Sequence, residues 1–280
     1  MNPLHLILLA IVQGLAELLP VSSSAHVIVA EKLLGLDPTT PAMTLLLVML
    51  HTGTMCAVIV YFWQAWRTTY FASRQACRTH GVHLLAATAV TGLIGLGLQT
   101  LIKHLLASDA SHFEMESLFG NARLMAAALA SAGVLILMSS RWRAGHGTPR
   151  LCTAVVVGAV QGLCLPFRGF SRSGATISTG LLLGMSRRKA EEFSFALAVV
   201  LTPVVIAREL HRFFAARAAT GVVSHETVLQ LLSPSLIGML LSFLAGLVAL
   251  RWLSRWLEQG RWHLFGVYCL VASLVVLWVG

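Results

Sequence analysis

Long apolar runs, separated by short clusters of charged residues, dominate the hydrophobic pattern of this chain of 280 residues. A helix needs about 20 predominantly apolar residues to cross the hydrocarbon core of a bilayer. The runs that reach this length predict six membrane-spanning helices, near residues 41–63, 83–105, 119–139, 190–212, 227–250 and 262–279. The fourth run is the least regular because Thr202-Pro203 interrupts it, but neighbouring helices can compensate for a proline in a membrane helix.

Two further apolar segments, 2–36 and 151–185, are broken at their centres by proline, glycine, serine and ionisable residues. They align with each other and share three motifs in the same order: Val-Gln-Gly-Leu at 12–15 and 160–163, Ser-x-Ser at 22–24 and 171–173, and a Leu-Leu-Gly triplet ending at Gly35 and Gly184. The second copy has one additional residue ahead of its serines. Three candidate spans follow each copy, which is the pattern of an internal repeat of the transporter type.

The loops around the second broken segment indicate how it lies in the membrane. The loops at 140–150 and 186–190 each contain three Lys or Arg residues, and basic loops are typically cytoplasmic. Both ends of the segment 151–185 are therefore expected on one side of the membrane, which makes the segment re-entrant. Three crossings then separate the copies and invert them, so that their tips meet near the middle of the membrane.

These patterns together predict the fold. We expect an all-α polytopic membrane protein made of two inverted repeats, each a re-entrant helical hairpin plus three transmembrane helices. The first repeat occupies residues 1–140 and the second residues 151–280, within a single integral membrane domain.

Composition favours a membrane protein and excludes a soluble one. Hydrophobic residues make up 57% of the chain and charged residues 11%, whereas a soluble domain has about 25% charged residues. The 20 Lys and Arg residues exceed the 11 Asp and Glu residues, which we attribute to basic loops beside anionic lipid head groups and not to nucleic-acid binding. The five cysteines are widely spaced and form no CxxC pair, so they predict neither a disulfide framework nor a metal site.

The hairpin tips carry the candidate chemistry, because ionisable groups at membrane depth commonly mark functional sites. The polar residues at the two tips are Gln13, Glu17, Ser22, Ser23, Ser24 and His26 in the first copy, and Arg168, Ser171, Arg172, Ser173 and Thr176 in the second. This set suits a phosphate group. The N–H groups that open a half-helix after each Ser-x-Ser can bind an anion, and Arg172 can hold phosphate oxygens. Glu17 can hold a divalent cation together with substrate oxygens.

Structural interpretations compete with these functional ones. Serines that follow a proline commonly cap helices, and His26 alone would be a hydrogen-bonded packing residue. His51, inside a predicted span, either bonds a neighbouring helix or belongs to the site. Arg172 is harder to explain structurally, because an arginine at membrane depth needs a partner or water.

The sequences of the two hairpin tips resemble the motifs of a known protein family. The run Gln13-Gly-Leu-Ala-Glu17-Leu-Leu-Pro-Val-Ser-Ser23-Ser-Ala-His26 closely resembles the (E/Q)xxxE-containing motif of the undecaprenyl-diphosphate phosphatases. The run Gly-Phe-Ser-Arg-Ser-Gly-Ala-Thr at 169–176 resembles the PGxSRSxxT motif of that family. His51-Thr-Gly-Thr and Glu192-Phe-Ser-Phe are similar to other family segments, and the resemblance covers essentially the whole chain. One departure is Arg168, which stands where the family has a proline.

The resemblance implies a bacterial inner-membrane enzyme with the two inverted re-entrant repeats described above. Such an enzyme hydrolyses undecaprenyl diphosphate to undecaprenyl phosphate and inorganic phosphate. The product is the lipid carrier recycled in peptidoglycan synthesis, and loss of the activity leads to bacitracin sensitivity. The family also uses a divalent cation, Mg²⁺ or Ca²⁺.

The resemblance carries catalytic roles to Glu17, Ser23, His26 and Arg172, with Glu17 also as the metal ligand. The resemblance also carries family roles to four further residues, and Ser22, Arg168 and His51 are added to them. The expected substrate-binding set is Gln13, Ser22, Ser171, Ser173, Thr176, Arg168 and His51. We expect Ser23 to be a covalent nucleophile with His26 as its base, and the alternative is a metal-bound water oriented by Glu17.

A second function class fits the same architecture. Inverted repeats with broken helices are also typical of secondary transporters, so that a lipid-phosphate or anion transporter or flippase is the alternative. An acid, a hydroxyl and an imidazole within residues 13–26, opposite a phosphate-binding arginine, favour the enzyme. The expected partners are a polyprenyl diphosphate lipid and the lipid bilayer, with homodimer formation left open and no nucleic acid.

Overall fold

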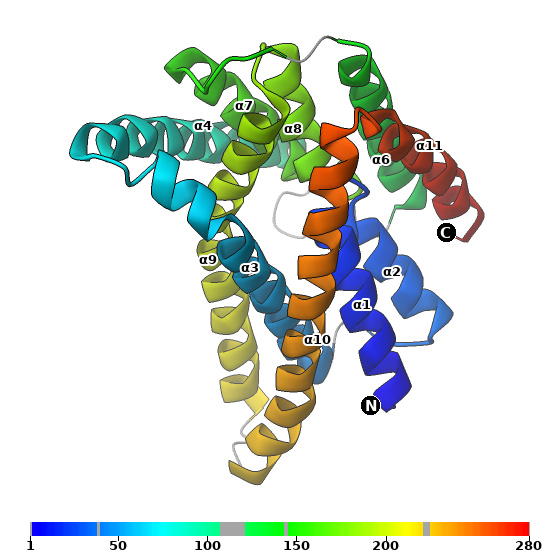
Figure 1. Ribbon diagram of the computed structural model, residues 1–280. Helices are drawn as coiled ribbons and strands as arrows, with labels where there is room; N and C mark the ends of the chain where they lie inside the picture. Colours follow the sequence, from blue (N-terminus) through cyan, green and yellow to red (C-terminus); the bar gives the residue numbers. More distant parts are fainter. Residues whose placement is uncertain (1, 38–39, 107–120, 143–144, 221–224, 280) are drawn as a thin grey trace.

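A computed structural model describes residues 2–37, 40–106, 121–142, 145–220 and 225–279, and helices make up nearly all of them (Figure 1). The helices are α1 (Pro3–Leu18), α2 (Ser23–Leu33), α3 (Pro41–Thr69), α4 (Arg74–Leu106), α6 (Ala122–Ser140), α7 (Leu151–Cys164), α8 (Arg172–Leu182), α9 (Arg187–Thr220), α10 (His225–Glu258) and α11 (Trp262–Val279).

Six of these described helices, α3, α4, α6, α9, α10 and α11, are long and apolar enough to cross a membrane. The all-α polytopic fold is therefore confirmed. The helices extend beyond the predicted spans into polar sequence, since α4 begins at Arg74 and α9 at Arg187. Pro203 lies inside α9 and does not end it.

The two broken segments both form helical hairpins. In the first hairpin α1 packs against α2, and in the second α7 packs against α8. The helices α2 and α8 have 11 residues each and are followed by glycines with positive φ, 62° at Gly35 and 83° at Gly184. The backbone of Gly147 bonds to that of Gly184 and Ser186, so that the two ends of the second hairpin lie together. The inverted orientation of the two copies stays a prediction.

The two halves of the chain pack against each other through the first helix of each hairpin. Helix α1 packs against α10, and α7 packs against α4. Glycine allows this close approach: a Cβ on Gly14 would lie 2.6 Å from the Cβ of Ala245, and one on Gly158 would overlap the Ala87 carbonyl. Each hairpin is thus held by a helix from the other half.

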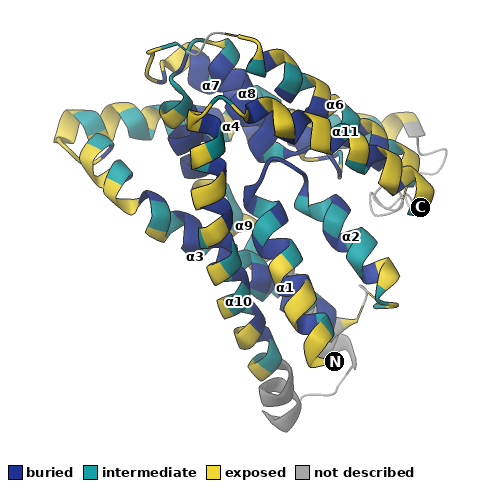
Figure 2. Cartoon of the chain, turned by 45° about the vertical axis from the view of Figure 1, so that its right-hand side comes forward, coloured by how far each residue is buried: buried dark blue, intermediate teal, exposed yellow. Residues whose placement is uncertain are grey.

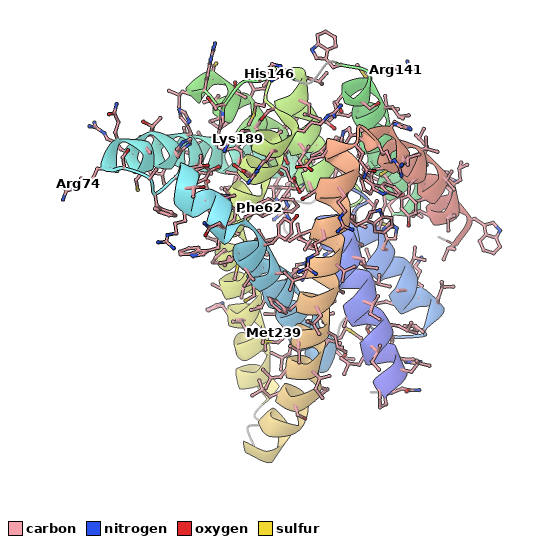
Figure 3. The ribbon with its side chains drawn as sticks, viewed as in Figure 1. Phe62, Arg74, Arg141, His146, Lys189 and Met239 are labelled. Carbon is pink, nitrogen blue, oxygen red and sulfur yellow. The ribbon has the colours of Figure 1, made fainter. Side chains whose placement is uncertain are left out.

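Burial follows the positions expected of a membrane helix bundle. Buried residues lie where α1, α7 and α8 meet their neighbours, whereas the outward faces of α4, α10 and α11 are exposed (Figure 2). Leu93, Leu240 and Leu274 on those faces are 75%, 57% and 66% exposed. Arg141 and His146 mark the end of the molecule that carries the loop before α7 (Figure 3).

Candidate functional site

The site is built on the break between α1 and α2. Leu19 has extended backbone angles and Pro20 cannot continue a helix, so that α1 ends at Leu18. Ser22 has a φ of 67°, the sole positive φ at a non-glycine residue within the described segments. Such a conformation costs about 1–3 kcal/mol and persists where the surroundings hold it. The turn brings Ser23, the first residue of α2, back towards Glu17.

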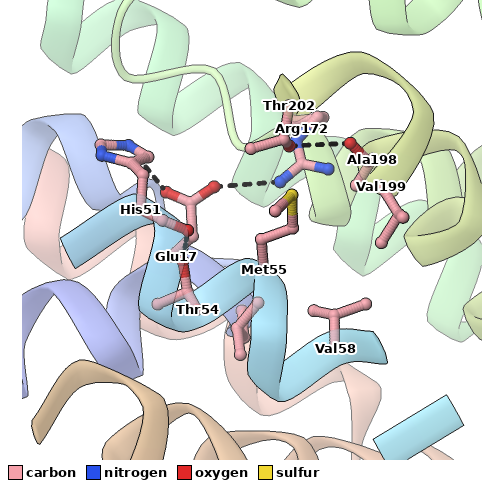
Figure 4. A pocket seen from close by; sticks show the side chains of 10 residues that line it. Glu17, His51, Thr54, Met55, Val58, Arg172, Ala198, Val199 and Thr202 are labelled. Carbon is pink, nitrogen blue, oxygen red and sulfur yellow. Dashed lines mark hydrogen bonds and ion pairs between the residues drawn. The ribbon is translucent and has the colours of Figure 1, made fainter. Parts of the chain in front are cut away.

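Glu17 is the centre of the polar contacts at this turn. The Ser23 hydroxyl donates to Glu17 Oε2 at 2.6 Å, and the Gln13 amide, one helical turn earlier, donates to the same oxygen at 3.2 Å. His51 Nε2 on α3 lies 3.6 Å from that oxygen, and its Nδ1 lies 2.8 Å from the Leu47 carbonyl oxygen. Arg172 Nη2 donates to the other carboxylate oxygen, Oε1, at 3.0 Å (Figure 4).

The second hairpin delivers Arg172 to this carboxylate. Arg172 is the first residue of α8, and the Ser171 hydroxyl caps the helix by accepting from the Gly174 N–H at 3.2 Å. The tips of the hairpins touch directly: the Gly169 N–H donates to Ser24 Oγ at 3.3 Å, and the Ser173 hydroxyl donates to the Leu19 carbonyl at 3.3 Å. The structure thus brings the two tips together, as expected.

The guanidinium of Arg172 retains a free donor. Its Nη1 is buried and has no hydrogen-bond partner among the described residues, while Nη2 is paired with Glu17. A buried donor without a partner is costly, and such groups commonly mark places where a ligand completes the bonding. Nη1 is therefore well suited to a phosphate oxygen.

A small pocket lies beside the paired Glu17 carboxylate and Arg172 guanidinium. It has a volume of about 20 Å³, and its lining comprises Glu17, Leu18, His51, Thr54, Met55, Val58, Arg172, Ala198, Val199 and Thr202. This is room for about one water molecule. This volume is too small for a phosphate group, so that side chains lining the pocket must move to admit one.

His26 does not reach Ser23. Its Nδ1 lies 2.8 Å from the carbonyl oxygen of Ser22, and its Nε2 lies 2.7 Å from the hydroxyl of Tyr268 on α11. The hydroxyl of Ser23 bonds to Glu17 instead, so that Glu17 is the group placed to accept its proton.

The remaining predicted substrate-binding residues do not line the pocket. The Ser22 hydroxyl is hydrogen-bonded to the Ser24 hydroxyl, and Ser171 caps α8. Ser173 links the turns of the two hairpins through its hydrogen bond to Leu19. Thr176 is bonded to Ser194 on α9 at 2.6 Å. Arg168 is exposed and interacts electrostatically with the buried Glu31 on α2, away from the pocket.

Several residues at or next to the site were not predicted from the sequence, and four of them carry a hydroxyl or a sulfur atom. Thr54, Met55 and Thr202 line the pocket, and Tyr268 contacts His26. Thr54 ends the His51-Thr-Gly-Thr run, and Thr202 precedes a proline inside a predicted span, so both had a signal. Tyr268 lies in a featureless apolar run and had none.

The described side chains offer few ligands for a metal ion. They contain no group of three His, Cys, Asp or Glu placed to hold a metal. Glu17 is the carboxylate of the pocket, and a second acidic ligand is absent from its lining. Mg²⁺ is commonly bound by one or two carboxylates plus substrate phosphates, so this set fits a cation that the diphosphate helps to bind.

Comparisons with known proteins cover the whole chain. The family model described as bacitracin resistance protein BacA matches residues 6–275. A protein of Acinetobacter baylyi named undecaprenyl-diphosphatase 2 is 63% identical over 278 residues, which are 99% of this chain and 98% of that protein. An undecaprenyl-diphosphatase of Desulfosudis oleivorans is 33% identical over 100% of this chain and 99% of its own length. One of Korarchaeum cryptofilum is 30% identical over 97% of both chains.

Proposed function

This chain belongs to the bacitracin resistance protein BacA family and hydrolyses undecaprenyl diphosphate, and we propose that it does so around Glu17 by transferring the terminal phosphate to Ser23. The observation that carries the site is the convergence of three groups from two hairpins: the Ser23 hydroxyl and the Arg172 guanidinium both contact the Glu17 carboxylate. A nucleophile, a proton acceptor and a phosphate-binding cation therefore meet in one place.

Arg172 binds the substrate in this proposal. As the diphosphate enters, its oxygens replace Glu17 as the partner of Nη2 and also accept from Nη1, which has no protein partner within the described structure. A guanidinium can make two parallel hydrogen bonds to a phosphate, which orients the terminal phosphorus. The same exchange releases the Glu17 carboxylate for proton transfer.

Glu17 and Ser23 carry out the transfer. As Ser23 Oγ attacks the terminal phosphorus, the new O–P bond forms, the bond to the bridging oxygen breaks, and undecaprenyl phosphate leaves. The hydroxyl proton moves to Glu17 Oε2, which lies 2.6 Å away. Glu17 then loses this proton to solvent. It next accepts one from the water that attacks the phosphoserine and passes that proton to Ser23 Oγ, releasing inorganic phosphate.

A divalent cation, Mg²⁺ or Ca²⁺, is part of the proposal. Glu17 and the diphosphate oxygens would hold it, with Ser23 and His51 beside them. When bound, it would neutralise charge on the phosphate groups. Gln13 orients Glu17 through a hydrogen bond from its neutral amide. Because the amide has no net charge, the negative charge of the Glu17 carboxylate stays available to the cation and to Arg172.

The cellular setting follows from the substrate. The chain is a multi-pass membrane protein, and we place it in the bacterial inner membrane, with the bilayer and the polyprenyl diphosphate as its partners. Its product, undecaprenyl phosphate, is the lipid carrier used again in cell-wall peptidoglycan synthesis. Homodimer formation stays a prediction.

Phosphate release by the purified protein tests this proposal against the transporter alternative. The full chain in detergent is given undecaprenyl diphosphate and Mg²⁺ or Ca²⁺, and inorganic phosphate is measured. We expect release by the native chain, loss with Ser23→Ala, and a phosphoserine at Ser23 when the reaction is quenched early. Turnover at the native rate by Ser23→Ala would overturn the covalent route and leave the water route through Glu17, whereas a chain that only transports lipid releases no phosphate.

A further inference from the structure

Tyr268 on α11 is joined to the turn that presents Ser23, although 242 residues separate it from His26. Its ring stacks on the His26 imidazole, with the centroids 5.6 Å apart and the planes 13° apart. Its hydroxyl oxygen lies 2.7 Å from His26 Nε2. The two rings are therefore fixed relative to each other by stacking as well as by a hydrogen bond.

The direction of these hydrogen bonds follows from the chemistry of the groups. The Ser22 carbonyl oxygen can only accept, so His26 Nδ1 must carry a hydrogen and donate to it at 2.8 Å. In a neutral imidazole Nε2 is then an acceptor, and the Tyr268 hydroxyl donates to it. Tyr268 thus fixes the tautomer in which His26 holds the Ser22 carbonyl.

The neighbouring residue on α11 also contacts this turn. Cys269 is fully buried, and its thiol donates to the Pro20 carbonyl at 3.2 Å. Cys269 therefore holds the Pro20 carbonyl directly, and Tyr268 holds the Ser22 carbonyl through His26. Both carbonyls belong to the strained segment that ends at Ser22, whose φ is 67°. The next residue is Ser23, whose hydroxyl must meet both Glu17 and the substrate phosphorus.

We infer that Tyr268 is a positioning residue of the phosphate-transfer site, which acts through the His26 imidazole to hold the Ser22 carbonyl and so the Ser23 hydroxyl in place. The inference rests on Ser23 taking part in the reaction proposed above. His26 then supports the turn and is not the base of Ser23, because both of its ring nitrogens are already engaged. The effect falls on kcat more than on KM, because substrate binding depends on Arg172.

A double-mutant cycle tests the inference with phosphate release as the measurement. Tyr268→Phe keeps the ring and removes the hydroxyl, and we expect kcat to fall about 3- to 10-fold with KM changed less than about 2-fold. His26→Asn places an amide N–H near the position of Nδ1 and removes Nε2. The kcat of this variant should also fall about 3- to 10-fold, and adding Tyr268→Phe to it should lower kcat no further.

Controls separate positioning from general damage. Tyr61→Phe removes a tyrosine hydrogen bond of similar length, the 2.9 Å bond to Ser254 on α10, and should leave kcat and KM unchanged. The backbone N–H of His26 also donates to the Ser22 carbonyl, at 3.4 Å, and every variant at this position keeps that bond. If Tyr268→Phe does not fold, His26→Ala, which has no side-chain donor for the Ser22 carbonyl, must lose more activity than His26→Asn.

Four results would overturn the inference. The first two are a native kcat in Tyr268→Phe, or the same loss of kcat when Tyr268→Phe is added to the His26→Asn chain. The other two are equal losses of activity in His26→Ala and His26→Asn, or a 100-fold or larger loss in His26→Asn, as expected for a missing general base. Ser23→Ala separates this test from the proposed function, because its activity reports on the route of phosphate transfer whatever Tyr268 does.

Discussion

The Glu17 carboxylate and the Arg172 guanidinium lie 3.0 Å apart across the contact of two turns, although 155 residues separate them in the chain. In the alignment of the two copies, Arg172 occupies the position of Ser23, and Leu165 that of Glu17. One copy has therefore kept the acid and the hydroxyl, and the other supplies the cation. A single hairpin carries only part of the chemistry, so that the site depends on both.

Replacing Arg172 tests its role as the phosphate ligand. Arg172→Ala should lower kcat/KM about 100- to 1,000-fold, because it removes the charge and both donors that face the reacting phosphate. Arg172→Lys keeps the charge but cannot make two parallel hydrogen bonds to the phosphate, so that its activity should lie between those of the native chain and Arg172→Ala. Arg251→Ala, an exposed arginine on α10, is the matched control and should retain native activity. A loss below about 3-fold in Arg172→Ala would contradict the assignment.

A second carboxylate beside Glu17 should change the response to cations. Gln13→Glu replaces the amide that lies 3.2 Å from Glu17 Oε2 by a like charge. Repulsion between two carboxylates is relieved by a cation, so this variant should lose more activity than the native chain on chelation and recover it at a lower Mg²⁺ or Ca²⁺ concentration. Phosphate release measured against cation concentration checks this.

The same substitution at an exposed position is the control for that experiment. Gln64→Glu on α3 should follow the native titration curve. Native and Gln13→Glu chains with identical cation dependence would argue against Glu17 as the cation ligand. Full activity of the native chain after chelation would argue against the cation altogether.

The sequence was sufficient to predict the helices, the duplicated hairpins and the group around Glu17, because each left a local signal. Apolar runs of sufficient length predict spans, and a repeated break predicts a repeated turn. The contact between Glu17 and Arg172 follows from placing two such turns opposite each other. Their family motifs support the same pairing.

The misplaced details depend on long-range packing, which no local pattern records. From the sequence, His26 was expected to be the base of Ser23, but α11 brings Tyr268 to the His26 ring and the Ser23 hydroxyl donates to Glu17. Arg168 was expected at the phosphate, but it lies towards Glu31. In both cases a partner from a distant element decides where the side chain goes.

Glycine packing between α4 and α7 predicts a stability difference between two similar substitutions. Gly158→Ala should lower the free energy of unfolding by about 1–3 kcal/mol, because the new methyl would overlap the Ala87 backbone. Gly97→Ala on α4 has no atom within 4 Å of its new methyl and should be neutral or stabilise by about 0.4–1 kcal/mol. Thermal unfolding in detergent measures both. Equal midpoints for the two variants would contradict the close packing of α4 on α7.

The buried carboxylate of Glu192 predicts that its two cationic partners contribute unequally to stability. Glu192 is 1% exposed, and its oxygens accept from Lys189 Nζ at 2.7 Å and from Arg188 Nε at 2.9 Å. The Lys189 side chain is 26% exposed and also donates to Thr69, which joins α9 to α3, whereas Arg188 is 68% exposed. Removing a partner from a buried charge costs up to about 3–5 kcal/mol, whereas exposed pairs contribute about 0–1 kcal/mol. Lys189→Met should therefore lower the unfolding midpoint by several degrees and Arg188→Met by much less, and equal shifts would show that the two cations contribute equally and that exposure does not weaken the arginine pair.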